Sequence, residues 1–161
     1  MLRPPVPTDT PAILALGVDT AMFRPDEVAP VQQMLDGFHA GQLVPGHRVE
    51  VWVDEPTAAP VGVAYFGPDP NTDRKWDLWM IAVAPARQGQ GIGGDLLRSA
   101  EAHARAGDGR VMLIETSSLP RFDPTHAFYR KHGYTEVARI PDFYRDGDSK
   151  VIFWKRLRDR A

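Results

Sequence analysis

The sequence predicts an α+β domain with a mixed, mostly antiparallel sheet and helices on both faces, arranged as a three-layer sandwich. Three observations support this prediction. Apolar residues recur at helical spacing in two early segments, they alternate with polar residues in the segments that follow, and a glycine-rich turn joins a strand-like segment to another helical one. With 161 residues the chain is long enough for one domain with a hydrophobic core, so a single domain over residues 1–161 is expected.

The first half of the chain is predicted to contain one short strand, two helices and three further strands. Leu2 and Arg3 form the short strand, and Pro11 suits the first turn of a helix because hydroxyl and carboxylate groups precede it. A similar start recurs at Pro25, and from His47 the apolar period changes to two, which is typical of a half-buried strand. The helices are expected at about 11–21 and 25–41, and the strands at about 47–53, 61–66 and 75–83.

The second half begins with a helix and continues with strands around one shorter helix. Ile92, Leu96, Ala100 and Ala104 lie on one helical stripe, and Gly107 follows it, where glycine favours termination. The apolar run after that glycine predicts a buried strand. The expected elements are a helix at about 91–106, a strand at 111–116, a loop at 117–124, a helix at 125–131, and strands at 135–140 and 150–155 around a loop at 141–149.

Composition excludes several function classes. The formal net charge is −2 and the basic residues are scattered, so nucleic acid is not an expected partner. The chain has no cysteine, which excludes disulfides and thiolate chemistry, and its five histidines lack metal-ligand spacing, so no metal is expected. No segment reaches the roughly 18 apolar residues of a membrane span, and the N-terminus lacks an apolar run of signal-peptide length. We therefore expect a cytoplasmic protein with no membrane contact.

The segment from Ile81 to Gly94 runs from the end of a strand through a glycine-rich turn into a helix. Glycines let the backbone bend and approach a ligand closely. The free N–H groups of the first helical turn point outward, and the helix dipole favours negative charge there. The segment is therefore a candidate pyrophosphate site.

Two other interpretations of the glycines stay open. The spacing Gly89-x-Gly91-x-x-Gly94 also satisfies the dinucleotide-binding fingerprint, with Glu115 in the role of the ribose-binding acid. Against it, residues 84–88 separate the first glycine from the strand end, whereas that fingerprint begins almost at the strand. The glycines also fit a turn that has only a structural role.

Gln88, Gly91 and Gly93 follow a strand that ends in an apolar-Ala-Val triplet. This pattern is similar to motif A of the GNAT superfamily of N-acetyltransferases, which reads Q/R-x-x-G-x-G/A, and the predicted order of elements resembles the family's order over nearly the whole chain. The resemblance implies the GNAT fold and acetyl-CoA as co-substrate. It further implies that the backbone of Ile81, Ala82 and Val83 binds the pantetheine arm. The residues implied for the pyrophosphate are Gln88, Gly89, Gln90, Gly91, Ile92 and Gly93, to which we add Gly94 as the next amide.

The same resemblance implies a catalytic acid. Tyr129 lies in a segment that looks like the family's FYxxxGF pattern, in which the tyrosine commonly serves as general acid, and its reference pKa of about 10 keeps it protonated at neutral pH. The alternative is a core aromatic residue at the end of a short helix. One position departs from the family: Phe122 stands where many relatives carry an asparagine, so the cofactor contact of that asparagine is not carried over.

A base is needed to take a proton from the amine, and two carboxylates are candidates. Glu115, at the end of a predicted strand, resembles the carboxylate that amino-terminal acetyltransferases of this superfamily use, and it is slightly favoured. Asp77 is the rival, at the position where other members carry a glutamate. Either is equally compatible with an ordinary surface or ion-paired carboxylate. The resemblance assigns the oxyanion contact to the backbone N–H of Val83.

These residues predict an enzyme that transfers acetyl from acetyl-CoA directly to a primary amine, whether a protein N-terminus, a lysine or a small-molecule amine. The alternative is a non-catalytic module that binds acetyl-CoA as a sensor or serves protein interaction. The acidic and aromatic loop at 141–148 is either an acceptor-binding segment or a solvated hairpin tip. Edge strands near the C-terminal end are compatible with a homodimer.

Overall fold

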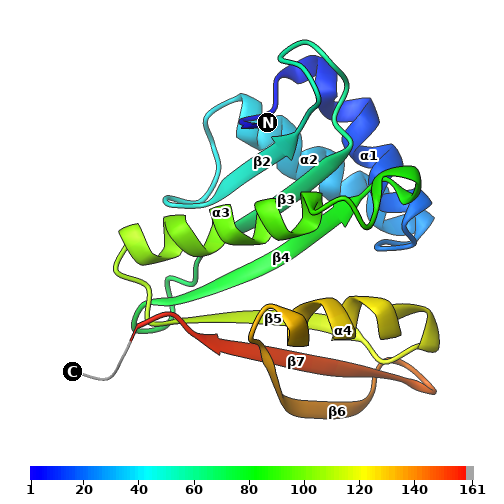
Figure 1. Ribbon diagram of the computed structural model, residues 1–161, viewed down its shortest axis with the longest axis vertical. Helices are drawn as coiled ribbons and strands as arrows, with labels where there is room; N and C mark the ends of the chain where they lie inside the picture. The colour runs from blue at the N-terminus through cyan, green and yellow to red at the C-terminus, as the bar shows by residue number, and fades with distance from the viewer. Residues whose placement is uncertain (159–161) are drawn as a thin grey trace. The chain divides into compact units, whose positions relative to one another are not determined.

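The computed structural model describes residues 1–158 and has the predicted order of elements (Figure 1). Within these residues seven strands form a mixed sheet in the order β1-β2-β3-β4-β5-β7-β6, in which β4 and β5 are parallel. The elements are β1 (Leu2–Arg3), α1 (Thr10–Asp19), α2 (Val28–His39), β2 (Arg48–Trp52), β3 (Gly62–Pro68), β4 (Lys75–Val83), α3 (Ile92–Ala106), β5 (Val111–Ser117), α4 (Asp123–Lys131), β6 (Thr135–Arg145) and β7 (Asp148–Arg156). The predicted fold class is thus confirmed.

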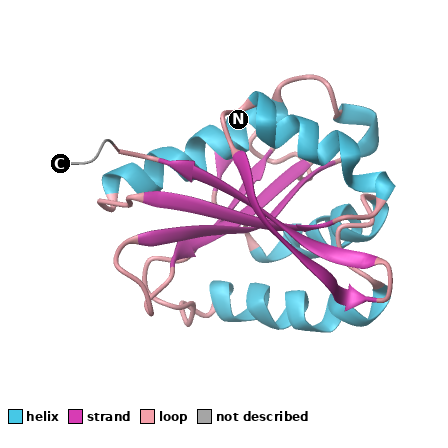
Figure 2. Ribbon diagram, turned by 90° about the horizontal axis from the view of Figure 1, so that it is seen from below, coloured by secondary structure: helices cyan, strands magenta, loops and turns pink. Residues whose placement is uncertain are grey.

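The chain divides into two compact units, and β4 and α3 contribute to both. The first unit comprises Met1–Gly67 and Met80–Ala100, and the second comprises Pro68–Trp79 and the chain from Glu101 onwards. Mostly short loops connect the helices and strands (Figure 2). None of the helices within residues 1–158 is long and apolar enough to cross a membrane.

The first unit has helices on both faces of its strands. On one face, side chains of α1 and α2 pack against alternate valines of β2, which places these two helices on a shared apolar core. On the other face, Ser99 of α3 donates a hydrogen bond to Glu50 of β2 at 2.6 Å, and a Cβ at Gly62 would lie only 3.0 Å from Ile92 and Leu96. The glycine therefore lets β3 approach α3 closely. The core residues are Ile13, Leu16, Leu35, Val49, Val51 and Val53.

The second unit covers one face of its strands with α4. The rings of His126 and Tyr129 each lie 5.4 Å from the ring of Phe153 on β7. Phe153 pairs with Ile114 of β5, so these side chains share the face that α4 covers. Because side chains alternate along a strand, Glu115 lies on the opposite face.

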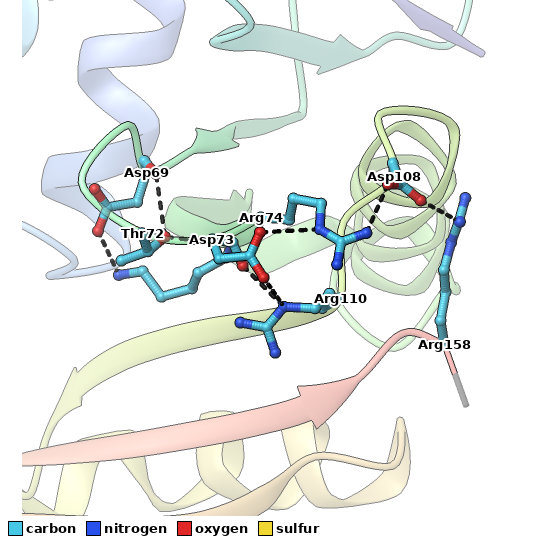
Figure 3. Close-up of polar contacts among 8 residues, drawn as sticks. Asp69, Thr72, Asp73, Arg74, Asp108, Arg110 and Arg158 are labelled. Carbon is cyan, nitrogen blue, oxygen red and sulfur yellow. Dashed lines mark hydrogen bonds and ion pairs between the residues drawn. The ribbon is translucent and has the colours of Figure 1, made fainter. Parts of the chain in front are cut away.

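Ion pairs join the loop before β4 to the loop before β5 (Figure 3). Arg74 contacts Asp108 at 2.7 Å and Arg110 contacts Asp73 at 3.1 Å, while Arg158 also pairs with Asp108. Arg74 and Asp108 both have positive φ, a conformation that most side chains avoid. These contacts lie where the parallel pairing of β4 with β5 begins, so they help to fix the register that places Asp77 opposite Leu113.

The predicted loop from Pro141 to Ser149 is wrong. β6 continues through Pro141 to Arg145, and β7 begins at Asp148, so only a two-residue turn at Asp146 and Gly147 separates them. Asp-Gly is a strong hairpin pair, and Gly147 has a φ of 77°, which glycine adopts without strain. Pro141 is tolerated because β6 lies at the sheet edge and its pairing register shifts there.

Glu101, at 5% exposure, is a buried carboxylate that joins α3 to the strands of the second unit. It pairs with Lys155 at 2.7 Å and with Arg105 at 3.1 Å, and it accepts a hydrogen bond from Tyr134 at 3.1 Å. A buried charge is tolerated only when its partners satisfy it in this way.

We expect Glu101→Ala to lower the free energy of unfolding by about 3–5 kcal/mol, because it leaves the Lys155 ammonium without its buried partner. Chemical denaturation checks this. Asp95→Asn is the matched control, since it removes a carboxylate of α3 that pairs with Arg98 in solvent, and it is expected to change stability by less than about 0.5 kcal/mol. Equal effects of the two substitutions would contradict the role given to Glu101.

Candidate active site

The turn between β4 and α3 has a backbone that requires glycine. Gly89 and Gly91 have φ of 75° and 85°, in the left-handed region. A Cβ at either position would meet nothing within 4 Å, so the protein itself leaves this side of the turn open. The glycines are therefore needed for backbone conformation, and their open side leaves room for a ligand to approach.

The amides at the start of α3 are oriented as an anion site requires. The N–H of Asp95 donates to the carbonyl of Gly91 at 3.0 Å. The amides of the preceding residues therefore belong to the first helical turn, and they have no hydrogen-bond acceptor within the helix. The helix dipole adds partial positive charge at this end. Upstream, the side chain of Gln88 donates to the carbonyl of Val83 at 3.1 Å and so links the turn to the end of β4.

The predicted cofactor-binding residues all lie in the first unit, in two runs that residues 84–87 separate. Burial along β4 alternates as predicted: Ala82 is buried, whereas Ile81 and Val83 are partly exposed. The ten residues span the last three residues of β4, the turn and the first residues of α3. They are Ile81, Ala82, Val83, Gln88, Gly89, Gln90, Gly91, Ile92, Gly93 and Gly94.

Tyr129, near the C-terminal end of α4, is only 4% exposed. Burial raises the pKa of its hydroxyl well above the usual range, so the side chain stays protonated at neutral pH. Within residues 1–158 no side chain or backbone group hydrogen-bonds to this hydroxyl. The ring packs in the core against Phe153.

The two candidate bases lie on neighbouring parallel strands, β4 and β5. Asp77 pairs with Lys75 at 3.0 Å, yet burial raises the pKa of its carboxyl, and the negative charges of Asp69 and Glu115 raise it further. Glu115 is more exposed and pairs with Lys150 at 2.5 Å. Both carboxylates already hold an ammonium group, so either must share its charge with that partner while it accepts a proton.

Tyr129 and Glu115 are not brought into contact. Tyr129 packs on the face of the second unit's strands that carries Phe153, whereas Glu115 is on the other face. A general acid acts on the departing sulfur and a base on the attacking nitrogen, which are different atoms. Both atoms are bonded to the same carbonyl carbon in the tetrahedral intermediate, and the structure does not bring the two predicted catalytic side chains into contact with one another.

The structure adds one side chain that sequence reasoning missed. Lys150 of β7 bridges the Glu115 carboxylate and the ring of Phe143, whose centroid lies 3.7 Å from its Nζ. The sequence offered no indication of this contact, because it depends on the register that places Lys150 opposite Ser117.

The acids of the β6–β7 hairpin mainly hold the hairpin together. Asp142 accepts a hydrogen bond from the N–H of Gly147 at 2.8 Å, and Asp148, at 6% exposure, accepts one from Ser117 at 2.5 Å. These contacts favour the hairpin-tip interpretation of Asp142 and Asp148 over attraction of a cationic amine. Phe122, the position that departs from the family pattern, ends a short 3-10 turn and stacks under Arg121.

No group of three histidine, aspartate or glutamate side chains within residues 1–158 has the geometry to hold a metal ion.

Comparison with known proteins decides the family. A family model described as an acetyltransferase (GNAT) domain matches residues 47–136. A solved structure from Desulfovibrio desulfuricans, assigned to the GNAT family of acetyltransferases, is 30% identical, with a TM-score of 0.89 over 98% of this chain and 99% of its own. The chain belongs to the GNAT family of acetyltransferases. It is therefore an acetyl-CoA-dependent acyltransferase, and the family predicted from Gln88, Gly91 and Gly93 is confirmed.

More distant GNAT structures share the fold. An aminoglycoside 6'-N-acetyltransferase complexed with coenzyme A is 16% identical, with a TM-score of 0.77 over 100% of this chain and 99% of its own. The acetyltransferase yncA from Salmonella typhimurium, solved with acetyl-CoA, is 20% identical, with a TM-score of 0.76 over 100% of this chain and 95% of its own. A search of curated proteins found no match.

We expect Gly91→Ala to lower the free energy of unfolding of this GNAT protein by about 1–2 kcal/mol, because alanine is strained at a φ of 85°. The matched control is Gly37→Ala in α2, where a Cβ likewise meets nothing within 4 Å but the backbone is helical. That change is expected to stabilise by about 0.5–1 kcal/mol. Urea denaturation measures both, and a Gly91 variant as stable as wild type would contradict the required left-handed turn.

Proposed function

We propose that this GNAT protein is an N-acetyltransferase that moves the acetyl group of acetyl-CoA directly to a primary amine. The observation that supports this most strongly is the open glycine turn at Gly89 and Gly91, which leads from β4 into the first amides of α3. Relatives of the same fold are described with coenzyme A or acetyl-CoA bound. Family membership favours this interpretation of the turn over the dinucleotide-binding one.

The proposed binding mode uses backbone groups. The amides from Gly89 to Gly94 would donate to the pyrophosphate, and Gln88, whose own amide donates to the carbonyl of Pro85, would border them. The helix dipole and the lack of intrahelical partners at the start of α3 favour an anion there. The end of β4, from Ile81 to Val83, would hydrogen-bond the pantetheine arm. The N–H of Val83 would donate to the oxyanion that forms when the amine attacks.

The reaction needs one substitution, removal of a proton from the amine and stabilisation of the departing thiolate. The neutral amine attacks the thioester carbonyl, the C–N bond forms, and the C–S bond breaks to release the thiolate of coenzyme A. Tyr129 donates its hydroxyl proton, in a hydrogen bond, to the departing sulfur. Because burial raises the pKa of Tyr129 above the value of about 8.5 for a thiol, full transfer is uphill, and stabilisation of the thiolate is its main contribution.

Glu115 is proposed as the base that removes the amine proton, directly or through water, with Asp77 as the alternative. The greater exposure of Glu115 suits contact with an acceptor. Burial raises the pKa of Asp77, which makes its carboxylate a stronger base. The acceptor stays open among a protein N-terminus, a lysine and a small-molecule amine, and the cytoplasmic location and homodimer stay predictions.

We expect calorimetric titration to detect acetyl-CoA binding by wild type, no NADH binding, and loss of acetyl-CoA binding in Gly91→Trp. The indole would occupy the open side of the turn and exclude the pyrophosphate. Gly41→Trp is the control, since Gly41 also has positive φ with open space around it but lies at the end of α2. NADH binding in place of acetyl-CoA would overturn the interpretation of the turn.

We expect Glu115→Gln to lower kcat/KM by about 10²-fold or more, and Tyr129→Phe to lower kcat to a similar extent. Release of coenzyme A thiol in the presence of candidate amines measures both, with Glu136→Gln as the control for loss of a partly exposed, ion-paired carboxylate. If Asp77→Asn causes the large loss and Glu115→Gln does not, the base is Asp77. Acetyl-CoA binding without turnover on any amine would favour the non-catalytic alternative.

A further inference from the structure

One guanidinium group in the chain's first unit joins the glycine turn to the segment that follows β2. Arg87 donates two hydrogen bonds to the carboxylate of Asp54, from its two terminal nitrogens at 2.5 and 2.7 Å. Its third donor, Nε, contacts the side-chain oxygen of Gln90 at 3.0 Å. The guanidinium also lies 5.8 Å from the ring centroid of Trp52, the last residue of β2.

The three polar residues come from different parts of the unit. Asp54 follows β2, Arg87 ends a short 3-10 turn after β4, and Gln90 lies between the two left-handed glycines, Gly89 and Gly91. Gln90 also reaches back to the carbonyl of Ala86 at 3.4 Å. The middle of the turn is therefore connected, through Arg87, to the segment that follows β2.

Such a connection matters because glycine turns are intrinsically flexible. Each glycine loses more backbone entropy on ordering than any other residue, and a ligand that orders a flexible turn must offset that loss. A fork-shaped guanidinium–carboxylate pair fixes both distance and orientation. Here that pair holds the residue that separates the two glycines.

We propose that Asp54 and Arg87 are positioning residues that hold the glycine turn, through Gln90, in the conformation that binds the pyrophosphate of acetyl-CoA. The inference rests on the proposed function and extends it to side chains outside the glycine motif. Asp54 and Arg87 touch neither the acetyl group nor the acceptor in this proposal, so they act on cofactor affinity and not on the chemical step.

A competing role for Arg87 is direct contact with a phosphate of the cofactor. The two roles predict opposite effects of removing the Asp54 charge. If Asp54 positions the turn through Arg87, its loss weakens acetyl-CoA binding. If Asp54 competes with a phosphate for Arg87, its loss frees the guanidinium and strengthens binding or leaves it unchanged.

The experiment is calorimetric titration of acetyl-CoA into wild type, Asp54→Asn, Arg87→Met and the double variant. We expect the Kd to rise about three- to tenfold in each single variant, which is modest because the side chains of Arg87 and Asp54 are 28% and 49% exposed. The Kd of the double variant is expected to be no higher than that of the weaker-binding single variant, because each single substitution already breaks the same Asp54–Arg87 contact. Asp54→Glu is expected to restore most of the affinity, and kcat at saturating acetyl-CoA is expected to stay at the wild-type value.

A control variant separates this connection from charge in general. Asp26→Asn breaks the pair of Arg24 with Asp26, in which two guanidinium donors also contact one carboxylate, at 3.0 Å each. It removes the same charge away from the glycine turn, so the Kd should be unchanged. Unchanged or tighter binding in Asp54→Asn would overturn the proposal.

A second measurement tests the positioning without any ligand. Amide hydrogen exchange at Gly89, Gln90 and Gly91 in the free protein is expected to be faster in Asp54→Asn than in wild type and Asp26→Asn. If wild type fails to bind acetyl-CoA, the proposed function fails, and the exchange data still decide the positioning role. Unchanged exchange at these amides would refute that role whatever the binding data show.

Discussion

The left-handed backbone at Gly89 and Gly91 is the constraint on which the proposed site depends. It turns the chain from the end of β4 into α3. The first amides of α3 have no hydrogen-bond acceptor within the helix. Every contact proposed for the pyrophosphate and the pantetheine arm is a backbone contact on one side or the other of this turn. Cofactor binding is thus set by backbone conformation, whereas the proton chemistry is assigned to side chains.

The elements around this turn could be predicted from the sequence because their determinants are local. The bounds of β4 agree with the prediction, since apolar alternation and Pro85 define both its interior and its end. The β6–β7 hairpin was mispredicted because Pro141 and a run of polar residues resemble a loop. The strand forms despite the proline because β6 lies at the edge of the sheet. Its edge position depends on the whole sheet and cannot be inferred from a short stretch of sequence.

The partners of the candidate catalytic groups could not be predicted for a related reason. Lys150 meets Glu115 because of strand register, and Arg87 meets Asp54 across residues distant in sequence. Residue type and spacing identified the carboxylates, whereas tertiary structure alone shows which ammonium or guanidinium each one holds. These ion-pair partners partly neutralise each carboxylate and so weaken its interaction with a substrate. The sequence motifs therefore describe only part of the site.

The irregular end of β6 has a consequence for how the protein behaves at high concentration. A long strand at a sheet edge is a template on which further chains can add, strand by strand, toward fibrils. Here Pro141 lacks an amide donor, and Asp142 has a φ of 51°, so the hydrogen-bonding row is interrupted midway between Val137 and Arg145. This interruption hinders the ordered addition of further strands at the edge. The apolar side chains on the edge nevertheless stay exposed at the surface, at Val137, Ile140, Phe143 and Tyr144.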